Sequence, residues 1–235
     1  MEAHSRRCSL LQTDEEYELL ILMKVTFGIT VHNETDSLRS LLDQLLEFIE
    51  SQEDSDEIVI LDDYSTNSDT ITILDEVSEN PNVTVYSRSL DRDFGAQKTY
   101  MNSLCKGEYI FQLDADELVA PQLLENLHEI LNANPEIELI WLPRVNTVEG
   151  LTEEHIQLWG WKVSSEGWVM WPDYQGRIYK NLPRIMWTGK VHERITGHLT
   201  YTFIPAQPEL AILHHKSIAR QEQQNSFYSQ IQGSE

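Results

Sequence analysis

Gly107-Glu-Tyr-Ile-Phe-Gln-Leu-Asp-Ala-Asp-Glu117 joins an apolar run to a cluster of carboxylates. The run at 108–113 predicts a strand that is buried on both faces of a sheet. Comparable short runs at 25–31, 58–61, 83–86 and 137–142 predict four more strands. Helical stretches separate the strands, and this alternation is typical of a doubly wound, mainly parallel α/β sheet of Rossmann-like plan.

The helical stretches are marked by apolar spacing and by the residues at their ends. Leucine and isoleucine recur over 36–50 at the spacing of one helix face. Further helices are expected at 68–79 and 94–105. A fourth begins at Pro121, which is favourable in a first helical turn, and ends at Asn134-Pro135.

Changes in composition divide the chain into four parts. Residues 1–22 lack a sustained hydrophobic periodicity and are interpreted as a tail. Translation could start at Met1 or at Met23. Residues 23–148 carry the strand–helix alternation. Residues 149–216 contain five of the six tryptophans and many turn signals, which indicates short strands and loops. Residues 217–235 are interpreted as a polar C-terminal helix and tail.

The net charge is the unusual feature of the composition. Seventeen Lys and Arg residues stand against 39 Asp and Glu residues, which gives a formal charge of −22. Such a field repels polyanions, so nucleic-acid binding and strong binding to an anionic membrane surface are disfavoured. A site that handles phosphate would therefore need a metal ion or a local cluster of basic residues.

Cysteine usage and hydropathy indicate the cellular compartment in which the protein is expected. Cys8 and Cys105 form neither a disulfide framework nor a zinc-binding pattern. Cys105 lies in an apolar-periodic stretch and is expected to be a buried thiol. No segment approaches the roughly 20 uninterrupted apolar residues of a membrane span. We expect a cytoplasmic protein without an integral membrane segment, with peripheral association left open.

Three acidic clusters follow predicted strands: His32-Asn33-Glu34, Asp62-Asp63 and Asp114-Ala115-Asp116-Glu117. The carboxyl ends of parallel strands meet at one rim of a sheet, so these carboxylates are expected to converge. A divalent cation with oxygen ligands would relieve their mutual repulsion. The alternative interpretation is that the acidic residues only cap the helices that follow.

Four segments follow one another along the chain: Ile29–Glu34, Ile60–Thr66, Phe94–Lys98 with Asn102, and Gly107–Glu117. In this order they resemble family-2 nucleotide-sugar glycosyltransferases, whose fold is named GT-A. The resemblance covers about half the chain well and continues more loosely to about residue 215. The segments at 171–181 and 189–193 resemble the members of the family that act on lipopolysaccharide core and related glycans.

The resemblance implies roles for individual residues. The loop after the first strand would line the nucleoside pocket, with Glu34 near the ribose, and Asp63 would accept a hydrogen bond from uracil. The Asp-x-Asp motif would bind Mn²⁺ or Mg²⁺ through Asp116, with Asp114 at the ribose or the metal. The complete set expected at the donor is Thr30, Val31, Asn33, Glu34, Asp62, Asp63, Lys98, Asp114, Ala115, Asp116 and Arg177.

The catalytic base and a further metal ligand are less well defined by the motifs. An inverting transfer needs a carboxylate to deprotonate the acceptor hydroxyl, and Glu193 and Asp173 are the candidates. The resemblance implies that a C-terminal histidine joins the metal ligands Asp114 and Asp116. His214 is the preferred residue and His215 the alternative.

These expectations combine into a metal-dependent inverting glycosyltransferase. Residues 23–148 would bind a nucleotide-sugar, expected to be UDP-linked, and residues 149–216 a glycan or lipid-linked saccharide acceptor. One alternative is a sugar nucleotidyltransferase, which would need a basic, glycine-rich loop where the chain has His32-Asn33-Glu34. Another is a non-catalytic glycan-binding module, in which we would expect the Asp-x-Asp pair to be lost.

Overall fold

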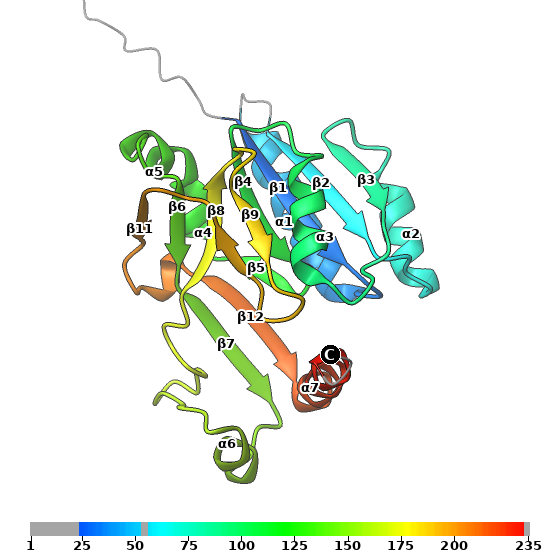
Figure 1. Cartoon of the computed structure of the whole chain (residues 1–235), viewed down its shortest axis with the longest axis vertical. Helices are drawn as coiled ribbons and strands as arrows, with labels where there is room; N and C mark the ends of the chain where they lie inside the picture. The colour runs from blue at the N-terminus through cyan, green and yellow to red at the C-terminus, as the bar shows by residue number, and fades with distance from the viewer. Residues whose placement is uncertain (1–23, 53–55, 233–235) are drawn as a thin grey trace, which may run out of the picture.

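The computed structural model describes residues 24–52 and 56–232, so the tail predicted at 1–22 lies outside the described residues (Figure 1). A seven-stranded sheet has the order β11-β6-β8-β4-β1-β2-β3. Its parallel part consists of β1 (Val25–Val31), β2 (Glu57–Asp62), β3 (Val83–Ser87) and β4 (Tyr109–Asp114). The predicted α/β fold with a mainly parallel sheet is confirmed.

Five helices accompany the parallel strands: α1 (Asp36–Ser51), α2 (Ser68–Val77), α3 (Phe94–Asn102), α4 (Pro121–Glu125) and α5 (Leu127–Ala133). Alternate residues of one strand face opposite cores. Ile58 and Ile60 pack in the cluster that contains α1, whereas Val59 and Leu61 pack against Met101 of α3. Burial on both faces explains why these strands are continuous apolar runs.

The single helix expected from Pro121 to Asn134 is interrupted in the structure. Asn126 has φ −99° and ψ 5° and separates α4 from α5. Its side-chain Nδ2 donates to the carbonyl of Gln122 at 2.7 Å. An asparagine that bonds the backbone of the preceding turn competes with helix continuation, which accounts for the break.

The second half of the chain extends the main sheet and adds a smaller one. β6 (Leu139–Leu142) and β11 (Tyr201–Phe203) lie at one edge, and β8 (Gln175–Lys180) runs antiparallel between β6 and β4. β12 (Ile212–Ser217) pairs with β5 (Glu117–Val119) and β7 (Arg144–Glu149). β9 (Met186–Thr188) and β10 (Arg194–Thr196) form a hairpin. This region agrees with the expected short strands and loops.

Two helices and a 3₁₀ turn complete the described chain: α6 (Glu153–Trp159), η1 (Pro208–Leu210) and α7 (Ile218–Gln232). α6 was not predicted, and it begins at a capping box in which the Thr152 hydroxyl accepts from the backbone N–H of His155. Figure 1 shows α7 near the ends of β7 and β12, beyond the main sheet. Within the described residues, no helix combines the length and apolar character needed to cross a membrane.

Strand register brings the predicted acidic clusters together. Thr30 of β1 pairs with Asp114 of β4, and Val31 pairs with Asp62 of β2. The loops that follow these three strands therefore start side by side at one rim. The second sheet starts from the same place, because β5 begins at Glu117, three residues after the end of β4.

Candidate active site

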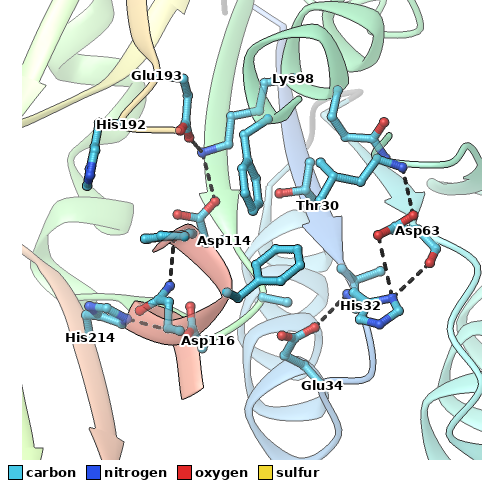
Figure 2. A pocket seen from close by; sticks show the side chains of 18 of the residues that line it. Thr30, His32, Glu34, Asp63, Lys98, Asp114, Asp116, His192, Glu193 and His214 are labelled. Carbon is cyan, nitrogen blue, oxygen red and sulfur yellow. Dashed lines mark hydrogen bonds and ion pairs between the residues drawn. The ribbon is translucent and has the colours of Figure 1, made fainter. Parts of the chain in front are cut away.

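A cavity of about 860 Å³ lies at the carboxyl ends of β1 and β4. Its walls come from the loop after β1, the Asp-x-Asp segment, α3, the β9–β10 hairpin and α7 (Figure 2). Of the expected donor-site residues, the lining contains Thr30, Val31, Glu34, Asp63, Lys98, Asp114, Ala115, Asp116 and Arg177. It also contains Glu193 and His214, so the structure places one base candidate and the preferred histidine in the same cavity.

Asp114 is held by positively charged and amide groups. Its Oδ2 accepts from Arg177 Nη2 at 2.8 Å, and its Oδ1 lies 3.1 Å from Lys98 Nζ. Gln112 Nε2 donates to the same Oδ1 at 3.0 Å. Burial alone would raise the pKa of Asp114, but Arg177 and Lys98 outweigh it and hold that pKa well below its usual range. Both oxygens are therefore already engaged.

Arg177 and Glu117 are buried side chains that contact Asp114. Arg177 is 3% exposed, and its Nη2 also donates to Glu117 Oε1 at 2.7 Å. Glu117 is fully buried and accepts a second bond from Arg144 Nη1 at 3.0 Å. Its other oxygen accepts from the backbone N–H of Asp114 at 3.0 Å. A buried carboxylate with two arginines thus fixes the position of the Asp-x-Asp turn.

Asp116 faces the opposite way, toward β12. Its Oδ2 lies 3.5 Å from His214 Nε2. Burial tends to raise the pKa of Asp116, and its neighbour His214 brings the net shift below the usual value. Figure 2 shows Asp116 and His214 apart from the Asp114–Lys98 pair. The two residues of the motif therefore have different partners.

The Asp116–His214 pair suits a divalent cation completed by phosphate oxygens. A carboxylate oxygen and an imidazole nitrogen 3.5 Å apart can both reach one ion. Mn²⁺ and Mg²⁺ bound with nucleotides commonly take only one or two protein ligands, the remainder being phosphate or water. Among residues 24–52 and 56–232 there is no group of three or more His, Cys, Asp or Glu side chains arranged to hold a metal. The donor set fits a metal that arrives with a diphosphate.

Lys98 and Glu193 meet across the cavity from different elements. Lys98 Nζ of α3 lies 2.7 Å from Glu193 Oε1 of the β9–β10 hairpin, and the lysine side chain is only 5% exposed. The same nitrogen lies 4.9 Å from the centre of the Trp187 ring. Lys98, which was expected to contact the donor, lines the cavity between two carboxylates and an aromatic face.

Two glycines allow the hairpin to approach α3. Gly95 N–H donates to the Gly189 carbonyl at 3.1 Å. A Cβ on Gly95 would lie 2.7 Å from that oxygen, and Gly189 has φ +103°. Neither position accommodates a larger side chain without strain. The close approach sets the distance between Lys98 and Glu193.

The loop after β1 forms the other end of the cavity. Asp63 Oδ1 accepts from the backbone N–H of Leu90 at 2.8 Å, and Glu34 Oε1 accepts from Arg220 of α7 at 2.5 Å. Burial raises the pKa of Glu34 despite its hydrogen bonds. Figure 2 shows Glu34, His32 and Asp63 on the same side of the cavity.

Asn33 and Asp62 were also expected to contact the donor, and the structure places both outside the lining of this cavity. Asn33 has φ +62°, and its Oδ1 accepts from the backbone N–H groups of Thr66 and Asn67 at 2.7 and 2.8 Å. Asp62 accepts from the Ser65 hydroxyl at 2.6 Å. Asn33 joins the loops after β1 and β2, and Asp62 holds the turn that begins the second loop.

Asp173, the second base candidate, also lies outside the main cavity lining and borders a smaller pocket next to it. Arg144 Nε and Nη2 donate to its Oδ2 at 3.0 and 2.7 Å, and Asn146 Nδ2 donates to the same oxygen at 2.7 Å. Burial works against the charged form, but Arg144 and these bonds lower the pKa of Asp173 overall. The carboxylate is committed to protein partners.

Sequence reasoning anticipated Arg220 as a cation for the diphosphate but missed the rest of the part of the site that α7 forms. Arg220, Gln224, Phe227 and Tyr228 all line the cavity. The Tyr228 ring lies edge-on to Phe94 at 5.7 Å. Burial, Asp114 and Glu193 all raise the pKa of the Tyr228 hydroxyl. The helix has polar residues on all sides, so its periodicity carries no signal of this role.

The family model described as Glycosyl transferase family 2 matches residues 26–202, and the chain belongs to this family. A poly(ribitol-phosphate) beta-glucosyltransferase from Bacillus spizizenii is 33% identical over 103 residues, which are 43% of this chain and 16% of that protein. The crystal structure of S. aureus TarS 1-349 superposes with a TM-score of 0.52 and 13% identity, covering 83% of this chain and 60% of TarS 1-349.

The same TarS fragment in complex with UDP-GlcNAc gives a TM-score of 0.53 at 13% identity, over 83% of this chain and 59% of that one. At this level of identity the similarity shows the fold, which is the predicted GT-A fold. The chain spans less than two thirds of the length of each of these relatives.

Proposed function

We propose that this protein transfers a sugar from a nucleoside-diphosphate sugar to a hydroxyl acceptor, with a divalent metal ion and with inversion at the sugar carbon. The observation that carries the proposal is that the two aspartates of the Asp-x-Asp motif have different partners. Asp114 is neutralised by Arg177 and Lys98, whereas Asp116 faces His214 at 3.5 Å on the cavity side. A site of this kind binds a diphosphate through a cation rather than through the acidic protein itself.

Asp116 and His214 would hold the ion. When bound, Mn²⁺ or Mg²⁺ would stabilise the charge that develops on the departing nucleoside diphosphate. Lys216 of β12 and Arg220 of α7 also line the cavity and would offer further positive charge to the phosphates. The net charge of −22 makes such local cations necessary.

Glu193 is our choice for the base that removes the acceptor proton. It lines the main cavity, and its side chain is 16% exposed. Lys98 Nζ, 2.7 Å away, holds the carboxylate in place. Asp173 is less suitable because Arg144 and Asn146 occupy its oxygen and it borders only the smaller pocket. General-base catalysis of this type contributes about 10²–10⁴-fold to the rate.

The donor is proposed to be UDP-linked. Asp63 lines the cavity, and the motif resemblance implies that it would accept a hydrogen bond from uracil. The structural neighbour TarS 1-349 has been crystallised with UDP-GlcNAc and with UDP, which supports the same choice here. Family membership favours transfer over the alternative sugar nucleotidyltransferase, and the intact Asp114–Asp116 motif favours it over a non-catalytic module.

For the acceptor we propose a hydroxyl of a glycan or of a lipid-linked saccharide. The segments at 171–181 and 189–193 suggest lipopolysaccharide core as one form, while the Bacillus spizizenii relative is described as acting on poly(ribitol-phosphate). These acceptors share sugar or polyol hydroxyls. We place the reaction in the cytoplasm or peripherally at its membrane, and the acidic surface disfavours nucleic acid as a partner.

The test is UDP binding with and without Mn²⁺, followed by a donor-hydrolysis screen across nucleotide-sugars. We expect UDP at about 100 times its Kd to stabilise the fold by about 2.7 kcal/mol, and only when Mn²⁺ is present. Asp116→Asn should abolish this stabilisation and the hydrolysis while the ligand-free melting temperature stays close to wild type. Asp75→Asn, an exposed position on α2, is the matched control. Indifference to every nucleoside diphosphate would refute the proposal.

A further inference from the structure

A chain of hydrogen bonds reaches His214 from the side opposite Asp116. Asn146 of β7 lies directly across from His214 of β12 in the parallel pair. Asn146 Oδ1 and His214 Nδ1 are 2.8 Å apart, and the two residues are 8% and 6% exposed. Asn146 also donates to Asp173, and nothing in the sequence motifs points to it.

The surroundings of Asn146 settle the orientation of its amide. Nδ2 lies 2.7 Å from Asp173 Oδ2 and 3.3 Å from the carbonyl oxygen of Val169. Arg144 holds that Asp173 oxygen with two bonds, which keeps the carboxylate in its charged form as an acceptor. Because both neighbours are acceptors, the amide NH₂ must face them. Oδ1 then faces His214.

The orientation of Asn146 in turn settles the tautomer of His214. An amide oxygen accepts and does not donate, so His214 Nδ1 must carry the hydrogen. In the neutral ring the lone pair is then on Nε2. This is the nitrogen that lies 3.5 Å from Asp116 Oδ2 and faces the cavity.

We propose that Asn146 is a positioning residue that presents His214 Nε2, together with Asp116, as a ready pair of metal ligands. Asp173 and Arg144 hold Asn146 in the required orientation, which gives Asp173 a role other than that of the base. The effect of Asn146 on metal binding rests on the proposed metal-dependent function. The tautomer itself is a property of the metal-free protein and can be measured without any turnover.

The first experiment is long-range ¹H–¹⁵N NMR of histidine-labelled, metal-free protein at a pH of about 8, where an ordinary imidazole is neutral. The His214 signals are assigned with His214→Gln. We expect the Nδ1–H form in the wild type and loss of that preference in Asn146→Leu. A wild-type His214 that is mainly Nε2–H would overturn the proposal, whether or not the variant folds.

The second experiment measures Mn²⁺ affinity in the presence of UDP by electron paramagnetic resonance of the free ion. Asn146→Leu should weaken Mn²⁺ binding about 10–100-fold, the usual effect of removing a group that orients a ligand. Asn102→Leu is the matched control, since it removes a different amide, one that accepts from the Tyr179 hydroxyl at 2.8 Å. It should leave the affinity within twofold.

The two readouts separate the possible failures. Unchanged affinity and tautomer in Asn146→Leu would refute the positioning role. A wild-type protein that has the Nδ1–H tautomer but never binds Mn²⁺ with UDP would refute the proposed metal function and leave the role of Asn146 in orienting His214 standing.

Discussion

Replacing Arg177 by Met tests whether the Asp-x-Asp turn depends on a buried charge network. Arg177 is 3% exposed and donates to Asp114 at 2.8 Å and to Glu117 at 2.7 Å, as well as to Gln112. Methionine fills a similar volume without a charge. The substitution therefore leaves the fully buried Glu117 with Arg144 as its remaining arginine partner and Asp114 with Lys98.

Breaking one side of a buried ion pair costs about 3–5 kcal/mol of unfolding free energy. At about 2–4 °C per kcal/mol for a chain of this size, the melting temperature at pH 7 should fall by about 6–20 °C. Arg184→Met is the control, because Arg184 pairs with Glu138 on the surface and its side chain is 42% exposed. Such an exposed pair contributes less than about 1 kcal/mol.

The pH dependence gives a sharper test than the size of the effect. In the wild type, Arg177 and Lys98 depress the pKa of Asp114, despite the opposing effect of burial. Its contribution to stability is therefore present above the unfolded pKa of about 4 and is lost only as pH falls through the lower folded value. Without Arg177 the folded pKa of Asp114 rises. The gap in stability between wild type and variant should thus narrow as pH falls from 7 toward about 4.

The assay is urea denaturation of wild type, Arg177→Met and Arg184→Met at several pH values. A loss below about 1 kcal/mol for Arg177→Met at pH 7 would show that these side chains interact no more strongly than an exposed ion pair. A gap that is independent of pH would show that protonation of Asp114 does not relieve the missing charge.

Two other predictions concern single side chains. Glu193→Gln should lower the transfer rate about 10²–10⁴-fold with UDP and Mn²⁺ affinity retained, measured by turnover and calorimetry, and wild-type turnover would remove Glu193 from the reaction. Burial raises the pKa of the Cys105 thiol to about 12. In a Cys8→Ser variant, iodoacetamide at pH 8 should therefore label the folded protein about 10³-fold more slowly than the urea-unfolded chain, and equal rates would contradict its burial.

The sheet and the meeting of its acidic loops were predictable because both follow from local patterns. The apolar runs of β1, β2 and β4 are continuous because both faces are covered, and parallel strands must end at one rim. The observed pairing of Thr30 with Asp114 is the direct result. The positions of the Asp-x-Asp residues and Lys98 in one cavity follow from motif order within such a sheet.

The partners of those residues were not predictable, because they come from distant segments whose spacing carries no periodic signal. Arg177 reaches Asp114 across 63 positions of sequence, and Asn146 reaches His214 across 68. Both contacts depend on how β8 and β7 pair with strands formed elsewhere in the chain. Asn33 and Asp62 show the converse, since a loop sequence cannot reveal whether an amide or carboxylate faces the ligand or the next loop.

The structure also changes the meaning of the net charge of −22. A site of unpaired carboxylates was expected, yet Asp114, Glu117 and Asp173 are each bonded to an arginine. Lys98 lies within 3.1 Å of Asp114 and 2.7 Å of Glu193. The arginines and Lys98 thus offset most of the negative charge at the site, and Asp116 faces His214 rather than an arginine. A cation placed there adds positive charge to a nearly balanced site, and this makes binding of a diphosphate compatible with an acidic protein.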